Sequence, residues 1–168
     1  MLKTKGYFEL NELKQLPGYP SEKRLKEGAV AVIECAEEIP CDPCEDACPK
    51  GAIKIGVPIT NLPKLDDTRC HGCGLCISAC PGQAIFVVDM TYSDAEATVQ
   101  LPFELLPHPK PGDVIKGLNR AGQSICDVRV LRVLNTRKSD RTAVIIVAVP
   151  KVFGMEVRNI EIQEKKQS

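Results

Sequence analysis

A run of four cysteines constrains this chain more than any other part of its sequence. The run occupies residues 70–81, CHGCGLCISACP, and its cysteines are Cys70, Cys73, Cys76 and Cys80. Intervals of two, two and three residues with a following proline are typical of iron–sulfur ligands. A tight loop supplies three thiolates to one cubane, so the fourth cysteine of such a run serves another cluster. Gly72 and Gly74 fit this interpretation because glycine accepts positive φ and brings backbone amides close to the sulfurs.

The composition narrows the class of protein further. Among the 168 residues, the number of Lys plus Arg (22) equals the number of Asp plus Glu (22). The chain therefore has no excess of positive charge that would indicate nucleic-acid binding. Nine cysteines could form disulfides in a secreted chain, but eight of them crowd into residues 35–80 at metal-ligand spacing. No apolar signal core follows Lys3 and Lys5 in residues 1–10, and no apolar run approaches the length of a membrane span. We therefore expect a reduced, metal-bound protein in the cytoplasm, without a membrane span.

An earlier stretch repeats the second half of the cysteine pattern. Cys41, Cys44 and Cys48 have intervals of two and three residues, and Pro49 follows Cys48. The first interval differs, because five residues separate Cys35 from Cys41. We interpret residues 36–40 as a lengthened loop that still returns a thiolate to the site.

The repeat continues beyond each Cys-Pro pair. Lys50-Gly51-Ala52-Ile53 follows the first pair, and Gly82-Gln83-Ala84-Ile85 follows the second. Each continuation leads into a short apolar segment, at residues 53–57 and 85–88, and another apolar segment at 29–33 precedes the first cysteine. The pattern predicts two pseudo-equivalent β-α-β halves whose strands pair around two clusters.

On these motifs, residues 29–90 resemble a two-cluster bacterial ferredoxin domain. The resemblance implies two [4Fe–4S] clusters, each with three ligands from one half and the Cys-Pro cysteine of the other. Cluster 1 would have the ligands Cys35, Cys41, Cys44 and Cys80. Cluster 2 would have the ligands Cys70, Cys73, Cys76 and Cys48. The unusual first interval leaves a second possibility open, in which Glu38 or Asp42 replaces Cys35.

The remaining chain predicts three further regions. Residues 1–28 form a polar arm that either covers the protein's own clusters and sheet or binds a partner. Residues 93–162 predict a small antiparallel β-barrel or sandwich, with strands at 114–118, 124–134, 141–149 and 157–162 and turns at 119–122 and 135–140. Residues 163–168 form a tail. The predicted fold class is α+β, with a ferredoxin domain at 29–92 before the β-domain.

Other candidate sites have weaker support. Zinc could bind Cys41, Cys44, Cys70 and Cys73, but this leaves the other four cysteines and both Cys-Pro pairs unexplained. Cys126 is interpreted as a small buried hydrophobe, and His108 as a linker residue. His71 is either an exposed polar residue or a group that tunes the cluster. A basic set forms either a solvated face or a docking patch. It comprises Arg129, Arg132, Arg137, Lys138 and Arg141.

The motifs indicate one-electron transfer and no catalysis by this chain alone, since no nucleophile pair or phosphate-binding fingerprint is present. The whole chain is also similar to small ferredoxin-like subunits of flavin-dependent dehydrogenases of the dye-linked amino-acid type. That resemblance implies a flavoprotein dehydrogenase as electron donor and a separate acceptor. Two alternatives remain open: a freely diffusing ferredoxin, and an interaction or sensor protein that uses its clusters structurally.

Overall fold

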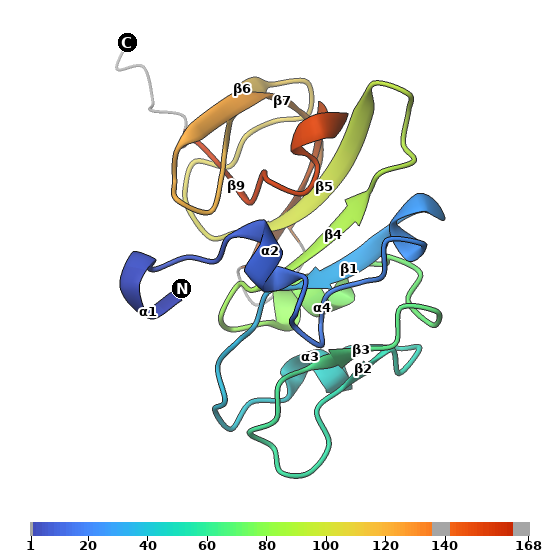
Figure 1. Cartoon of the computed structure of the whole chain (residues 1–168). Helices are drawn as coiled ribbons and strands as arrows, with labels where there is room; N and C mark the ends of the chain where they lie inside the picture. The colour runs from blue at the N-terminus through green and yellow to red at the C-terminus, as the bar shows by residue number, and fades with distance from the viewer. Residues whose placement is uncertain (1, 136–141, 163–168) are drawn as a thin grey trace.

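Antiparallel strands make up most of the chain, with a few short helices between them (Figure 1). The computed structural model describes residues 2–135 and 142–162. Within these residues the helices are α1 (Leu2–Lys5), α2 (Leu10–Leu13), α3 (Pro43–Asp46) and α4 (Leu75–Ala79), with 3₁₀ turns η1 (Arg24–Lys26) and η3 (Lys151–Phe153). The strands are β1 (Val30–Ile33), β2 (Ile53–Lys54), β3 (Lys64–Leu65), β4 (Ile85–Asp89), β5 (Glu96–Phe103), β6 (Val114–Leu118), β7 (Ser124–Leu134), β8 (Ala143–Pro150) and β9 (Asn159–Ile160).

The cysteine-rich region has the two β-α-β halves that the sequence predicts. The first half is β1-α3-β2 and the second is β3-α4-β4. The halves interlock, because β1 pairs antiparallel with β4 and β2 pairs antiparallel with β3. Strand β2 ends at Lys54, earlier than expected from the apolar run to Val57, and Val57 itself is exposed.

Strands β1 and β4 form a wall between two hydrophobic cores. Alternate side chains of a strand point to opposite faces, so Val32 and its cross-strand partner Phe86 pack into one core. Ala31 and its partner Val87 pack into the other, which contains the cysteine side chains. In Figure 1 the strands β5, β6, β7 and β9 lie above this wall, and α3, α4, β2 and β3 lie below it. Both faces of β1 and β4 are therefore buried.

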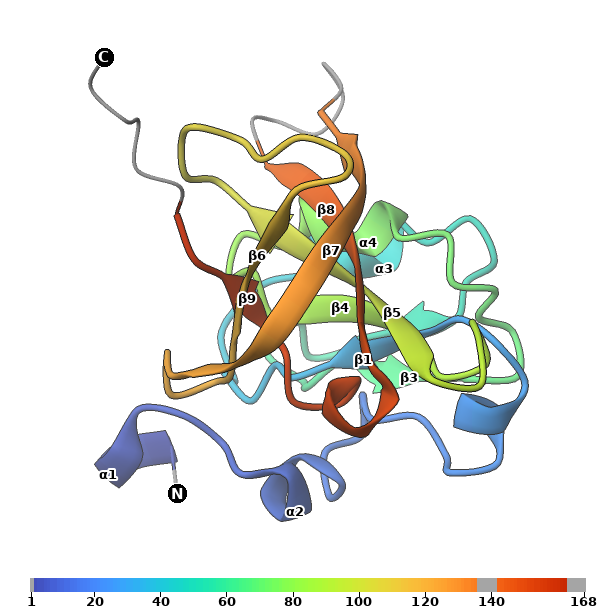
Figure 2. The ribbon, with the colours of Figure 1, turned by 90° about the horizontal axis from the view of Figure 1, so that it is seen from above.

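The expectation of a separate barrel or sandwich after residue 92 is wrong in one respect. The strands beyond that point continue the sheet that β1 and β4 begin, in the order β1-β4-β5-β8-β7-β6-β9. This order is open among the described residues, since no pairing joins β9 back to β1. The sheet nevertheless folds over, because β1, β4, β6 and β9 all contribute to one core. Figure 2 shows β6 and β7 lying over β4 and β5.

Strand β5 is the element that joins the two regions. It follows β4 after a turn in which Asp89 accepts hydrogen bonds from the amide and hydroxyl of Thr91. It pairs with β4 at residues 98–100 and with β8 along residues 96–103. Pro102 has no amide hydrogen to donate, and it lies where the β4 pairing has already ended. Strand β5 therefore accommodates Pro102, although a proline within a segment usually indicates that the segment is not a central strand.

The other predicted strands match the structure closely. Strands β6 and β7 have the predicted bounds. Strand β8 begins at Ala143 instead of residue 141 and ends one residue later than predicted, while β9 covers only Asn159–Ile160 of the expected 157–162. Most of the predicted turn at 135–140 and the tail at 163–168 lie outside the described residues, as do Arg137, Lys138 and Arg141.

The N-terminal arm packs on the protein's own sheet, the first of its two expected roles. Leu13 is fully buried, and Tyr19 packs against the core above the wall. The carbonyl of Gly18 accepts a hydrogen bond from the amide of Ile33 at 3.1 Å, and the carbonyl of Pro17 accepts one from Leu65 at 3.0 Å. The arm therefore extends along β1 and contacts both halves of the repeat.

No helix in the described ranges has the length and apolar character to span a membrane.

Candidate iron–sulfur centres

Two cavities below the wall are each lined by four cysteines. One is lined by Cys35, Cys41, Cys44 and Cys80. The other is lined by Cys48, Cys70, Cys73 and Cys76. Each set takes three cysteines from one half of the repeat and the Cys-Pro cysteine from the other. The structure thus brings together the same two sets of cysteines that the ferredoxin resemblance implies.

The elements of the first half place their cysteines around α3. Cys35 comes two residues after β1, Cys41 and Cys44 lie at the N-terminal end of α3, and Cys48 follows the helix. The Glu45 carboxylate accepts hydrogen bonds from the amides of Ile55 (2.6 Å) and Gly56 (3.1 Å), which ties α3 to the β2 segment. These two amides are the main cause that lowers the pKa of Glu45 to about 2.

The second half depends on two glycines. Gly72 has φ of 69° and Gly74 has φ of 79°, both in the left-handed region that favours glycine. A Cβ atom on Gly72 would lie 2.5 Å from the Cβ of Ala29 and 2.8 Å from its carbonyl oxygen. The loop between Cys70 and Cys73 therefore packs directly on the residue that leads into β1. The positive φ confirms the conformation expected from the sequence, and the contact with Ala29 is a second reason for glycine that the sequence did not indicate.

Backbone amides donate hydrogen bonds to three of the sulfurs. The Ala52 amide lies 3.2 Å from Cys48 Sγ, and the Ala84 amide lies 3.5 Å from Cys80 Sγ. Both bonds run from the fourth residue after a Cys-Pro cysteine, so they repeat with the halves. Burial raises the pKa of Cys48, but the amides, with that of Ala52 foremost, outweigh burial and hold the pKa below its usual value. The Ala31 amide lies 3.4 Å from Cys70 Sγ.

The most buried thiols resist ionisation unless a positive charge is present. Burial raises the pKa of Cys44 to about 11, and the neighbouring Cys80, Cys41 and Cys35 add to the effect. Burial likewise raises the pKa of Cys76 to about 12, with contributions from Cys70, Cys73 and Cys48. Four thiolates at such a site need a cationic centre, since metal binding deprotonates cysteine. The donor sets therefore fit [4Fe–4S] clusters, which bind four thiolates each.

A single zinc ion would need its ligands to converge on one point. Within residues 2–135 and 142–162, no group of three or more His, Cys, Asp or Glu side chains does so.

The alternative ligands to Cys35 do not line the cavity. Cys35 itself lines it, together with Glu37, whereas Glu38 is exposed and neither Glu38 nor Asp42 contributes to the lining.

The remaining candidates lie at the edge of the cavities or away from them. Exposed His71 lies at the edge of the cavity that contains Cys73. Cys126 is on β7, half-buried against the core above the wall, where burial raises its pKa.

His108 packs edge-on against Phe103 at a centroid distance of 6.3 Å, so its ring has a packing role beyond that of a linker residue. Arg129 pairs with Glu96 at 3.0 Å on the surface.

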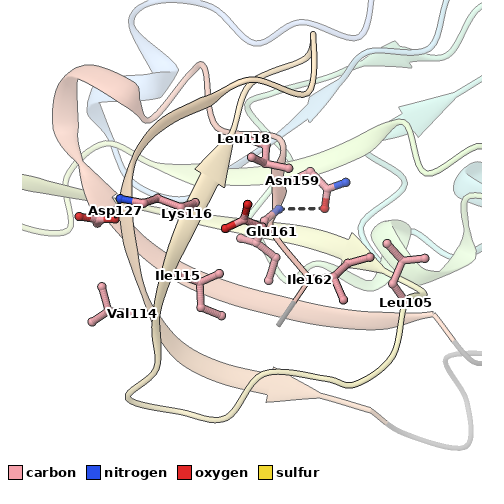
Figure 3. Close-up of a pocket in the computed structure, with 10 residues that line it drawn as sticks. Leu105, Val114, Ile115, Lys116, Leu118, Asp127, Asn159, Glu161 and Ile162 are labelled. Carbon is pink, nitrogen blue, oxygen red and sulfur yellow. Dashed lines mark hydrogen bonds and ion pairs between the residues drawn. The ribbon is translucent and has the colours of Figure 1, made fainter. Parts of the chain in front are cut away.

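A larger groove at the far end of the sheet is lined by β6, by Asp127 of β7, by residues 159–162 and by Leu105 (Figure 3). Its lining contains no cysteine or histidine, so it offers no iron–sulfur ligands.

Sequence reasoning missed a set of arginines next to the ligand segments. Arg24 contacts the backbone at Cys70, and Arg120 and Arg158 contact Glu34, the residue before Cys35. The position of Glu34 beside a cysteine was visible in the sequence. No local pattern links Glu34 to arginines more than eighty residues away.

Comparison with known proteins identifies part of the chain. The family model described as "4Fe-4S binding domain" matches residues 63–86. An uncharacterized ferredoxin, MJ0155, of Methanocaldococcus jannaschii is 34% identical over 86 residues, which cover 50% of this chain and 51% of that protein. Translation initiation factor RLI1 of Saccharomyces cerevisiae is 30% identical over 116 residues, covering 62% of this chain and 19% of that protein.

A third relative belongs to an ion-translocating oxidoreductase complex of Methanosarcina acetivorans, as one of its subunits. It is 39% identical over 57 residues, covering 34% of this chain and 19% of that protein. The chain spans about half the length of the first of these relatives and about a fifth of the other two. No solved structure matches the chain. The chain thus contains a 4Fe–4S binding domain of the ferredoxin type.

Proposed function

We propose that this chain is a non-catalytic electron carrier that holds two [4Fe–4S] clusters. Cluster 1 has the ligands Cys35, Cys41, Cys44 and Cys80, and cluster 2 has the ligands Cys48, Cys70, Cys73 and Cys76. One observation carries the proposal: each cavity is lined by four cysteines drawn from both halves of the repeat.

Iron–sulfur clusters of this type supply one-electron transfer without a bound organic substrate. The chain's own contribution is to place the thiolates, to donate hydrogen bonds to sulfur and to limit solvent access. Cys73 is exposed, and the neighbouring Leu75 side chain is 55% exposed, so the cavity of cluster 2 reaches the surface. We therefore propose that electrons exchange with a partner beside Cys73.

The proposal is tested on protein purified without oxygen. Iron and sulfide analysis should give about eight of each per chain, as two cubanes require. Dithionite should bleach the visible absorption, and an added one-electron acceptor should restore it. A colourless protein that contains zinc would refute the assignment. Clusters that cannot be reduced and reoxidised would favour the structural or sensor role.

We further propose a flavoprotein dehydrogenase as the electron donor. Its support is the resemblance of the whole chain to ferredoxin-like subunits of such enzymes. One specific observation favours a freely diffusing carrier instead. The arm and strands β5 to β9 complete the cores on which the cysteine region packs, so they need no partner to explain them.

Size-exclusion chromatography of native extract separates these two possibilities. Co-elution of this chain with a polypeptide that carries FAD, and reduction of its clusters by that polypeptide's substrate, supports the subunit. Elution at the size of the single chain, about 18.4 kDa, supports the free carrier.

A further inference from the structure

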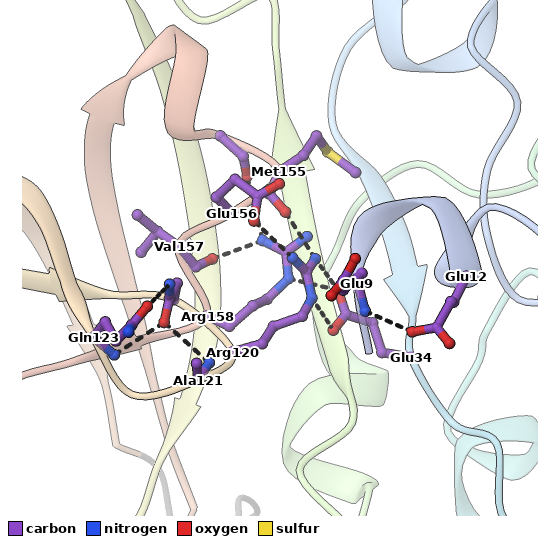
Figure 4. Close-up of polar contacts among 12 residues, drawn as sticks. Glu9, Glu12, Glu34, Arg120, Ala121, Gln123, Met155, Glu156, Val157 and Arg158 are labelled. Atoms are coloured by element: carbon purple, nitrogen blue, oxygen red, sulfur yellow. Dashed lines mark hydrogen bonds and ion pairs between the residues drawn. The ribbon is translucent and has the colours of Figure 1, made fainter. Parts of the chain in front are cut away.

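A buried ion-pair network lies directly before the first cysteine of cluster 1. The Arg120 guanidinium donates to both Glu34 carboxylate oxygens, from Nε at 2.8 Å and from Nη2 at 2.7 Å. Arg158 Nε donates to the same carboxylate at 2.6 Å (Figure 4). The three side chains are between 4% and 10% exposed, so water screens these pairs only weakly. We call these three residues the Glu34 clamp.

Other contacts fix the two arginines in turn. Arg120 Nη2 also donates to the Met155 carbonyl at 2.7 Å, and Arg158 Nη1 donates to the Val157 carbonyl at 2.6 Å. The Arg158 guanidinium lies 4.9 Å from the ring centroid of Phe86, a distance that permits a cation–π contact. The Glu34 carboxylate is therefore held by groups that are themselves rigidly placed on the C-terminal part of the sheet.

The position of Cys35 needs such an external support. In the second ligand run, two residues separate Cys70 from Cys73, so the short loop restricts the position of Cys70 from one side only. Five residues separate Cys35 from Cys41, and residues 37–40 of this loop are exposed. Glu34, the residue that precedes Cys35, is instead held on the N-terminal side of the cysteine. Its carboxylate is held by the Glu34 clamp, and its amide donates a hydrogen bond to the Ala84 carbonyl at 2.8 Å.

A separate arginine contacts the first cysteine of cluster 2. Arg24, in the N-terminal arm, donates to the carbonyls of Cys70 (2.8 Å) and Ala29 (2.7 Å) through Nη2. Its Nη1 donates to the Gly28 carbonyl at 3.1 Å, and its Nε donates to the Asp67 carbonyl at 3.0 Å. We call Arg24 with these four carbonyls the Arg24 clamp. It joins the segment that leads into β1 to the segment that leads into the second cysteine run.

We propose that these two clamps are separate positioning devices, each of which sets the first ligand of one cluster from outside the ferredoxin repeat. The C-terminal part of the sheet positions Cys35 for cluster 1, and the N-terminal arm positions Cys70 for cluster 2. The inference rests on the proposed ligand assignment. The N-terminal arm and the C-terminal part of the sheet then each have a role at an electron-transfer centre. Each of these two regions acts on one cluster only.

The test compares conservative variants of the two clamps in the full chain, purified without oxygen. Arg120→Lys keeps the charge but removes the two-point contact with Glu34. Arg24→Lys keeps the charge but cannot reach four carbonyls. Arg129→Lys serves as a control, because its pair with Glu96 is on the surface. Glu34→Gln is the second variant for the first clamp, in case Arg120→Lys does not fold.

Reduction potentials are measured by EPR-monitored redox titration, and three-iron clusters are detected by their oxidised EPR signal. Cys35→Ser and Cys70→Ser identify which signal belongs to which cluster. We expect Arg120→Lys or Glu34→Gln to shift the potential of cluster 1 and raise its three-iron fraction several-fold, with cluster 2 unchanged. Arg24→Lys should change cluster 2 alone, and Arg129→Lys should change neither.

Two results overturn the inference. One is that the clamp variants keep both clusters at wild-type potential. The other is that both clusters change together in every clamp variant, as a general loss of stability would cause. Failure of the proposed function is a different result, since the unmutated chain would then lack iron and sulfide.

Discussion

Replacement of Gly72 by alanine tests how tightly the second cysteine loop packs on the strand beside it. The backbone at Gly72 is left-handed, which costs an L-residue about 1–2 kcal/mol. The new Cβ would also lie 2.5 Å from the Cβ of Ala29 and 2.8 Å from its carbonyl carbon and oxygen. Ala29 cannot easily move, because its carbonyl accepts a bond from Arg24 and its chain continues into β1. Overpacking of this kind adds roughly 1–3 kcal/mol.

Gly122 provides a matched control for this substitution. Its φ is 76°, and a Cβ there would meet nothing within 4 Å. Gly122→Ala should therefore show the conformational cost alone, about 1–2 kcal/mol, whereas Gly72→Ala should show about 2–5 kcal/mol. For a chain of this size, each kcal/mol lowers Tm by roughly 2–4 °C.

The assay is thermal unfolding of the anaerobic holoprotein, followed by circular dichroism at one fixed scan rate. A fixed rate is needed because loss of the clusters makes unfolding irreversible. Gly72→Ala should unfold roughly 2–12 °C below Gly122→Ala, from the 1–3 kcal/mol that the contact with Ala29 contributes. Equal transition temperatures would show that the loop can move away from Ala29, and would refute the packing argument.

Three further substitutions test other parts of the structure. Cys35→Ser should lower the iron content or leave a three-iron EPR signal at cluster 1, and unchanged four-iron signals at both sites would reject Cys35 as a ligand. Cys126→Ser should keep both clusters by iron analysis, because this half-buried thiol lies on β7 outside both cavities, and loss of either cluster would contradict its structural role. Leu101→Ala should destabilise the protein by about 2–5 kcal/mol, since this side chain is fully buried above the wall, while the EPR signals of the assembled clusters stay unchanged. A fall in the transition temperature of less than about 2–4 °C in the same fixed-rate thermal assay would show that the core collapses around the deletion.

The sequence was most informative where a local pattern carries the structure. Strands β6 and β7 were predicted to the residue, because alternating side chains flank a turn at residues 119–122. The grouping of the cysteines followed from the internal repeat and the ferredoxin resemblance. The positive φ of Gly72 was expected from its place between two ligands, whereas its 2.5 Å contact with Ala29 was not.

The missed features depend on long-range pairing. Strand β5 was not among the expected strands. Glu96 and Pro102 disfavour a strand, and its partners β4 and β8 stabilise it. Without β5, nothing in the sequence connects the cysteine region to the later strands in one sheet. The Glu34 clamp was missed for the same reason, since ion pairs between distant residues leave no periodic signal.

The doubly buried wall has a consequence for any shortened version of this protein. A chain that stopped at residue 92, where the sequence suggests a domain boundary, would keep both cysteine runs but lose β5 and its neighbours. Val32, Phe86 and Val88 would then face solvent, and β4 would present unpaired amides and carbonyls along residues 87–89. An apolar open edge of this kind recruits strands from other molecules. The minimal fragment that binds iron would therefore be prone to self-association, because it lacks the later strands that cover this edge.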